Sequence, residues 1–269
     1  MDGLTDMSAA RNYRMSMAYD GTDYAGFQIQ RDGRTVQGAL EEALSRITQR
    51  AVRVAAAGRT DAGVHAAAQV VSFRSKWRHS EAELERALNA VLPDDIAVRQ
   101  VERVAETFHA RFSASSREYL YRIYRAPVRV PYIDRYAWQV NKELQGERLT
   151  RATRMLVREA DFRAFGQAAD GRSTVRRIVH AEWSVAPVAY ADVPGWDFYI
   201  EANGFLRGMV RRIVGTLVQV GLGVLEPEIV EEILLSADPA RAAAPAPARG
   251  LFFWRAWYPG DRRDAETSR

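Results

Sequence analysis

The chain has 269 residues, of which 47% are hydrophobic and 27% charged, as in a globular protein with one large or two small domains. It contains no cysteine, which excludes disulfides, thiolate nucleophiles, iron–sulfur clusters and cysteine-ligated zinc. It has no run of about 18 uncharged apolar residues, so a membrane-spanning helix is not expected. Residues 1–11 carry Asp2 and Asp6 and lack the apolar core of a secretory signal, so we expect a cytoplasmic protein.

The net charge of +4 comes almost entirely from arginine: lysine occurs only at Lys76 and Lys142, so 36 of the 38 basic residues are arginine. The planar guanidinium binds phosphate through two hydrogen bonds and stacks on bases, although a biased codon composition would give the same usage. None of the four histidines has the helical i, i+4 spacing of metal ligands with another. The sequence therefore predicts a protein without a metal or cofactor. Whether the arginines bind phosphate must be judged from their positions along the chain.

Hydrophobic periodicity and capping signals predict the secondary structure in chain order. Strands are expected at residues 13–19, 52–57, 69–73, 96–104, 117–125, 135–140, 175–185, 196–202 and 251–258. Helices are expected at residues 36–50, 81–92, 147–159 and 205–222, and from Pro227 onward. Thr35 is a suitable N-cap for the first helix, and Ser80 with Glu83 forms a capping box for the second. This alternation indicates an α+β fold with a mainly antiparallel sheet.

Two halves of the chain are expected, with a boundary near residues 128–131. The N-terminal α/β half covers residues 13–127 and carries the candidate catalytic loop, and the C-terminal α/β half covers residues 128–260. Residues 1–12 are expected to be a flexible extension and residues 261–269 a flexible tail. The Ala- and Pro-rich segment at residues 237–249 is interpreted as a connector rather than a domain boundary.

The densest group of unusual residues is GRTDAGVH at residues 58–65, between two predicted strands. Gly58 and Gly63 allow a tight turn and a close approach of the backbone to a ligand. Asp61 is a carboxylate at neutral pH, and the nearby Arg59 keeps it ionised, which makes it a candidate nucleophile or base. The alternative is that Asp61 only binds the amides of the turn and that Arg59 is solvated.

Residues 58–65 resemble the signature of the tRNA pseudouridine synthase A family, and other segments agree with that family in the same order. These segments are residues 19–28 (YDGTDYAGFQ), 35–44, 108–113 (FHARFS), 117–121 (REYLY), 205–215 and 246–251. The resemblance covers residues 13–258, with mild departures at Phe27 and Phe253 and a loose fit at residues 167–174. Several motifs in the correct order are far more specific than one motif alone.

The resemblance implies an isomerase that converts uridine to pseudouridine at positions 38–40 in the anticodon stem-loop of tRNA, without a cofactor. The N1–C1′ bond breaks, the base turns and a C5–C1′ bond forms. Asp61 would attack C1′ or C6, or remove a ribose proton, and these alternatives stay open. Tyr119 would stack on the uracil and accept the C5 proton. Arg59 would assist base flipping and pair with Asp61, while Val64 and Leu251 would form apolar walls of the uracil pocket.

The expected architecture is two α/β halves that share a central, mainly antiparallel sheet, with a basic cleft between them. The expected partner is the tRNA anticodon arm, bound by a homodimer. The expected RNA contacts are Phe108, His109, Ala110, Arg111, Phe112, Arg78, Arg172, Arg207 and Arg211. Arg207 and Arg211 are four residues apart, so we expect them on one face of a helix. His65 and His109 are interpreted as hydrogen-bonding scaffold rather than as acid–base catalysts.

Two other classes of protein compete with this interpretation. A non-catalytic RNA-binding module or RNA chaperone would use the same basic surface, but it has no need for the carboxylate of Asp61 among phosphates. A glycoside hydrolase needs a pair of carboxylates about 5–10 Å apart, and no second acid lies in a motif. The sequence therefore favours the RNA-modifying isomerase.

Overall fold

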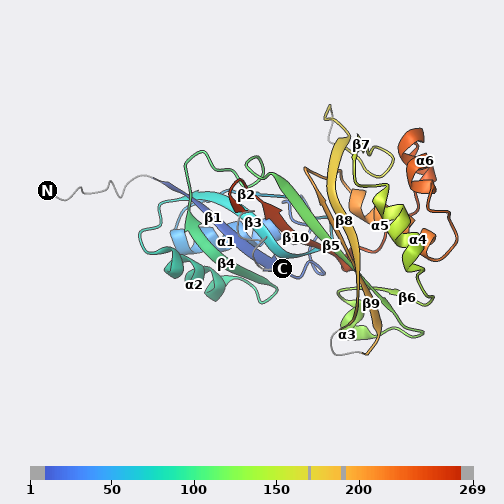
Figure 1. Ribbon diagram of the computed structural model, residues 1–269. Coiled ribbons are helices and arrows are strands. Elements are labelled where there is room, and N and C mark those ends of the chain that lie inside the picture. The colour runs from blue at the N-terminus through green and yellow to red at the C-terminus, as the bar shows by residue number, and fades with distance from the viewer. Residues whose placement is uncertain (1–9, 169–170, 189–191, 262–269) are drawn as a thin grey trace. The chain divides into compact units, whose positions relative to one another are not determined.

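The computed structural model describes residues 10–168, 171–188 and 192–261. Within these residues the chain has a mixed α+β structure with ten strands, six α-helices and a large, mostly antiparallel sheet, which confirms the predicted fold class (Figure 1). Contacts group the described residues into two compact units, one formed by those up to residue 115 and from residue 253 onward, and the other by those between residues 116 and 252.

The first unit is built on a sheet in the order β4-β1-β3-β10, with β2 paired to β3. Its strands are β1 (Arg11–Tyr19), β2 (Val54–Ala56), β3 (His65–Ser75), β4 (Ile96–Arg103) and the later part of β10 (Leu251–Trp257). The central strand β1 runs antiparallel to both β3 and β4. Tyr13, Met15 and Met17 alternate along β1 and are fully buried, so this face of the sheet carries the core of the unit.

The first unit contains two helices, and the N-cap residues that the sequence predicts for them are confirmed. In α1 (Val36–Thr48), the Thr35 hydroxyl accepts a hydrogen bond from the Gly38 N–H at 3.2 Å. In α2 (Glu81–Val91), the Ser80 hydroxyl accepts from the Glu83 N–H at 3.3 Å, and the Glu83 carboxylate accepts from the Ser80 N–H at 2.9 Å. Helix α2 packs against β4 and against α1 (Figure 1).

The second unit is built on a sheet in the order β5-β9-β8-β7, with β6 parallel to β5. Its strands are β5 (Ser116–Arg125), β6 (Trp138–Val140), β7 (Glu159–Asp161), β8 (Val175–Pro187) and β9 (Pro194–Ala202). Strands β5 and β9 pair from Arg117 opposite Ala202 to Tyr124 opposite Gly195. This long pairing joins β5 to the later strands, so the contacts divide the chain before β5, whereas the sequence predicts a boundary near residues 128–131.

The helices of the second unit differ from the predicted ones at several ends. They are α3 (Pro131–Asp134), α4 (Gly146–Arg154), α5 (Met209–Gly221) and α6 (Ile229–Ser236), with 3-10 turns at Pro239–Arg241 and Ala248–Gly250. The helix predicted at residues 147–159 ends early, because residues 159–161 form β7 and pair with β8. The sequence does not predict the short helix α3. Helices α4 and α5 pack together, and α4 also contacts β8 (Figure 1).

The Ala- and Pro-rich segment 237–249 packs closely along α5. A Cβ atom at Gly215 would lie only 2.1 Å from the Ala244 carbonyl oxygen, so only glycine allows this approach. The Thr216 hydroxyl accepts from the Ala243 N–H at 3.1 Å, and the Ala246 N–H donates to the Arg211 carbonyl at 2.9 Å. The segment is thus an ordered part of the second unit.

Residues 1–9 of the predicted extension and residues 262–269 of the predicted tail lie outside the described residues. Arg11 and Asn12 belong to β1. The Tyr258 N–H donates to the Asp261 carboxylate at 3.0 Å. Among the helices described, none has the length and apolar character needed to cross a membrane.

Candidate active site

The loop at residues 58–64 connects β2 to β3 and is fixed by two buried polar residues. The Gly58 N–H donates to the Gln69 side-chain oxygen at 3.3 Å, and the Gln69 amide donates back to the Gly58 carbonyl at 2.8 Å. The Thr60 hydroxyl shares a 2.8 Å hydrogen bond with the Tyr19 hydroxyl. Burial raises the pKa of Tyr19 to about 12, so its phenol stays neutral beside Thr60. The loop is therefore anchored on both sides of Arg59.

The two predicted functional residues of this loop flank buried Thr60. Arg59 is exposed and Asp61 is half-buried, whereas Thr60 is only 6% exposed. Within the described ranges no ion pair joins Arg59 to Asp61, so their pairing stays a prediction. The Val64 N–H donates to the Asp61 carbonyl at 3.2 Å and closes the turn, and the Val64 side chain is buried. This arrangement holds the Asp61 backbone while leaving its carboxylate partly accessible.

The segment at residues 20–27 packs directly against this loop. The Phe27 N–H donates to the Thr60 carbonyl at 3.0 Å, and the Gly63 N–H donates to the Tyr24 carbonyl at 3.3 Å. Gly26 has φ of +104°, and a Cβ atom there would lie 2.8 Å from the Thr60 carbonyl oxygen. At Gly21 a Cβ atom would lie 1.9 Å from the Val64 carbonyl oxygen. Both glycines are therefore needed for the two backbones to approach each other.

His65 follows the loop at the start of β3 and is almost completely buried. Its Nδ1 lies 3.1 Å from the Gly21 nitrogen, which donates to it, and 3.1 Å from an Asp20 carboxylate oxygen. The ring thus joins the start of the 20–27 segment to the end of the 58–65 loop. This placement supports the interpretation of His65 as scaffold.

The predicted RNA-contacting segment at residues 108–113 also belongs to the first unit. The Asn12 side chain donates to the Ala105 and Phe108 carbonyls, each at 2.9 Å. The Ala110 N–H donates to the Ser72 hydroxyl at 3.0 Å, and the Ala110 carbonyl accepts from the Tyr258 hydroxyl at 2.7 Å. The contacts of Asn12 and Tyr258 are not predicted from the sequence, because residues so distant along the chain give no local signal of their contact.

Within this segment the side chains divide into anchors and exposed groups. Phe108 packs on Tyr258 with ring centroids 5.1 Å apart, and Ala110 is fully buried. Phe112 is 73% exposed; its ring lies 4.5 Å from that of His109 and 5.6 Å from the Arg111 guanidinium carbon. An exposed aromatic ring beside arginine is suited to stacking on a nucleobase. Arg78 is also exposed, in the connection between β3 and α2.

In the second unit, Tyr119 and Leu251 lie on buried parts of their strands. Tyr119 is 8% exposed, stands opposite Ile200 in the β5–β9 pair and contacts Phe205 edge-on at a centroid distance of 5.0 Å. Leu251 is 6% exposed and begins β10. The preceding turn packs on β5, because the Tyr121 hydroxyl donates to the Pro247 carbonyl at 2.8 Å.

The predicted arginine contacts of the second unit have different surroundings. Arg172 and Arg207 are exposed. Arg211 is half-buried, and its Nε donates to the Ala246 carbonyl at 2.7 Å. Arg207 precedes α5, because its backbone exchanges two hydrogen bonds with Gln167, at 3.0 and 3.1 Å, and Gly208 turns the chain at φ of 72°. The expectation that Arg207 and Arg211 share one helix face is therefore wrong.

A metal site would require several ligand side chains close together. Among the described residues, no group of three or more His, Asp or Glu side chains has an arrangement that would hold one. The polar groups of the 58–65 loop instead make hydrogen bonds with protein partners on the 20–27 segment and on β3. The loop is thus shaped by protein contacts.

Comparison with known proteins identifies the family. Residues 15–113 and 152–259 match the family described as tRNA pseudouridine synthase. The tRNA pseudouridine synthase A of Pseudothermotoga lettingae is 39% identical over 246 residues, covering 91% of this chain and 98% of that protein. The proteins of the same name from Geobacillus kaustophilus and a Thermoanaerobacter species are 41% and 38% identical, covering 90% and 92% of this chain and 92% and 100% of those proteins. With matches of this extent, the chain belongs to the tRNA pseudouridine synthase family, a family of isomerases.

Proposed function

We propose that this protein isomerises uridine to pseudouridine at positions 38–40 in the anticodon stem-loop of tRNA. The observation that carries the proposal is the loop at residues 58–64, which is anchored by Gln69 and Tyr19 and leaves Asp61 half-buried. This loop lies within the match to the tRNA pseudouridine synthase family. The target positions and the homodimer follow from the motif resemblance, and we also propose that the protein is cytoplasmic.

The reaction assigns a different task to each residue. Asp61 attacks C1′ or C6 of the target nucleotide, or removes a ribose proton, as the N1–C1′ bond breaks. After the base turns, the C5–C1′ bond forms and any bond from Asp61 to the nucleotide breaks. Tyr119 then accepts the C5 proton while N1 takes up a proton from solvent, so the net change is an isomerisation without oxidation. Arg59, which is exposed, helps hold the flipped nucleotide, because extruding a base from a stack costs a few kcal/mol. Val64 and Leu251 are buried apolar residues and help to exclude water.

The alternative is a non-catalytic RNA-binding module or RNA chaperone with the same basic surface. Its function would depend on residues such as Phe112 and Arg207, both of which are exposed. It would not need a carboxylate on a loop anchored from both flanks, as Asp61 is. The anchored loop therefore favours catalysis.

The proposal is tested by incubating the protein with unmodified tRNA transcripts and mapping pseudouridine by chemical modification and mass spectrometry. Pseudouridine is expected at positions 38–40, and none is expected in transcripts that carry cytidine at those positions. Modification only at other positions would contradict the assignment of the target. Tight binding without any pseudouridine would instead favour the RNA-binding alternative.

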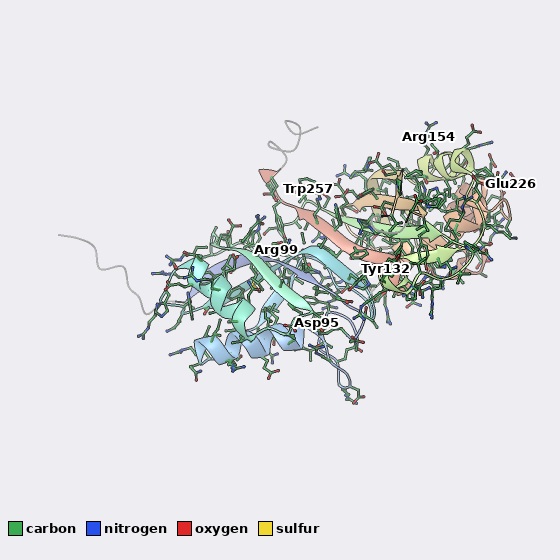
Figure 2. The ribbon with its side chains drawn as sticks, turned by 90° about the horizontal axis from the view of Figure 1, so that it is seen from below. Asp95, Arg99, Tyr132, Arg154, Glu226 and Trp257 are labelled. Carbon is green, nitrogen blue, oxygen red and sulfur yellow. The ribbon has the colours of Figure 1, made fainter. Side chains whose placement is uncertain are left out.

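Replacing Arg207 by Ala is expected to weaken tRNA binding and to reduce its dependence on salt. Phosphate contacts release counterions, so the slope of log K against log salt changes by about one unit for each contact removed. Arg99→Ala is the matched control, because Arg99 is an exposed arginine on β4 outside the predicted contacts (Figure 2). Filter binding over a salt series measures both slopes. Equal slopes for the wild type and Arg207→Ala would show that Arg207 does not contact phosphate.

A further inference from the structure

Asp95 lies in the first unit, directly before β4, the strand that carries Arg99 (Figure 2). Its carboxylate accepts a hydrogen bond from the Tyr24 hydroxyl at 2.5 Å. Arg34 donates to both oxygens of the same carboxylate, at 2.8 and 3.3 Å. The Asp95 carbonyl accepts from the Asp20 N–H at 3.0 Å. Three separate residues of the 20–34 segment therefore converge on Asp95.

Tyr24 and Arg34 also contact each other. The Arg34 guanidinium carbon lies 4.4 Å from the centroid of the Tyr24 ring, and the Arg34 carbonyl accepts from the Ala25 N–H at 2.8 Å. Tyr24 is only 3% exposed. Burial raises the pKa of Tyr24, and its hydrogen bond to the Asp95 carboxylate raises that pKa further, so the phenol remains a proton donor to Asp95. The segment is thus fixed at Asp95 by a charged and hydrogen-bonded cluster.

The opposite side of the same segment holds the catalytic loop. The Tyr24 carbonyl accepts from the Gly63 N–H, and the Phe27 N–H donates to the Thr60 carbonyl. These two hydrogen bonds bracket Asp61, one residue before it and two residues after it. Gly26 lies between them, and a Cβ atom there would be 3.3 Å from the Asp61 carbonyl carbon. A shift of the 20–27 segment must therefore move the Asp61 backbone or break these contacts.

We infer that Asp95 is a positioning residue that, through Tyr24 and Arg34, holds the Asp61 loop in its reactive position. The inference rests on the proposed function, and it assigns no chemistry to Asp95 itself. A reacting group must be held to within about 0.5 Å by the residues that support it. Here that support comes from a carboxylate 34 residues beyond Asp61 in sequence, which holds the 20–34 segment against which the 58–64 loop packs.

The test is Asp95→Asn, which keeps the side-chain shape and removes the charge that binds Arg34. We expect kcat for pseudouridine formation to fall about 10- to 100-fold, because displacing a reacting group by about 1 Å can cost that much. The Kd for tRNA is expected to stay within about twofold of the wild-type value. Asp94→Asn is the matched control, because Asp94 is the adjacent residue, is exposed and makes no side-chain hydrogen bond or ion pair among the described residues. It should leave kcat unchanged.

Tyr24→Phe provides a second, independent variant. It removes only the hydroxyl that donates to Asp95 and keeps the ring beside Arg34. The kcat of Tyr24→Phe should fall in the same direction, and combining it with Asp95→Asn should cost less than the product of the separate effects, because both changes break one connection. Fully multiplicative effects would contradict a shared path from Asp95 to Asp61.

Hydrogen exchange gives a readout that does not depend on activity. In Asp95→Asn, amides at residues 20–27 and 58–64 should exchange faster, while those at residues 108–113 should keep their wild-type rates. A wild-type enzyme that forms no pseudouridine would contradict the proposed function, and the exchange pattern would still test the connection. An active wild type with an unchanged kcat in Asp95→Asn would overturn the positioning role. So would uniformly faster exchange across the first unit, which would indicate only lost stability.

Discussion

Replacing Asp61 by Asn is expected to abolish pseudouridine formation while leaving the fold and the tRNA affinity intact. Asparagine has nearly the same shape, and the Asp61 carbonyl would still accept the hydrogen bond from the Val64 N–H. The Asp61 carboxylate makes no ion pair or side-chain hydrogen bond within the described part of the chain, so its loss leaves no buried partner unsatisfied. An amide cannot act as the nucleophile or base, and removing such a group typically costs on the order of 10⁴-fold or more in rate.

The measurement is a single-turnover reaction with enzyme in excess over unmodified tRNA, followed by quantification of pseudouridine. The melting temperature and the tRNA Kd are measured on the same preparation of Asp61→Asn. Asp94→Asn removes one exposed carboxylate from the same unit and serves as the control for the change in net charge. Pseudouridine formed by Asp61→Asn at a rate near that of the wild type would overturn the catalytic assignment.

The features that were predicted well are those decided by neighbouring residues in the sequence. The first turn of α1 depends on Thr35 three residues before Gly38, and that of α2 depends on Ser80 and Glu83. The alternation of buried residues in β1 is equally local, since side chains of a strand point to opposite faces in turn. The 58–65 loop was recognised because its glycines interrupt two apolar strands.

The features that were missed depend on contacts between distant segments. Helix α5 begins at Met209 rather than at residue 205, because Arg207 is held by backbone hydrogen bonds to Gln167, forty residues earlier in the chain. The helix predicted up to residue 159 ends earlier, because residues 159–161 pair with strand β8. The hydrophobic periodicity of a short stretch of sequence cannot reveal pairing partners that lie far away along the chain.

The candidate site shows the same division between local and distant information. Asp61 and Arg59 were recognised from their own loop, but the residues that hold the loop lie elsewhere in sequence. Gly21 and Gly26 let two backbones meet at Val64 and Thr60, and the sequence around each glycine does not indicate these partners. The convergence of Tyr24 and Arg34 on Asp95 joins positions 71 and 61 residues apart, and no local pattern indicates it.

Replacing Tyr119 by Phe is expected to separate binding from the last step of the reaction. The ring stays beside Phe205, which it contacts edge-on at 5.0 Å, so stacking on the uracil should be retained. The hydroxyl is lost, and with it the proposed acceptor of the C5 proton. General-base catalysis of this kind typically contributes 10²- to 10⁴-fold, so release of the C5 proton should slow by about that factor. Binding of tRNA and the earlier steps at Asp61 should persist.

A tRNA tritiated at C5 of the target uridine measures this step directly, because tritium leaves only when the C5 proton is removed. Tyr132→Phe is the control, since Tyr132 is a 64% exposed tyrosine in the same unit (Figure 2). Tyr119→Leu removes the ring as well and should also weaken capture of the base, because stacking is worth roughly 1–3 kcal/mol per base. Normal tritium release by Tyr119→Phe would mean that another base or water takes the proton. Equal binding by the Phe and Leu variants would show that the ring contributes no stacking, and the role of Tyr119 would then be limited to its hydroxyl.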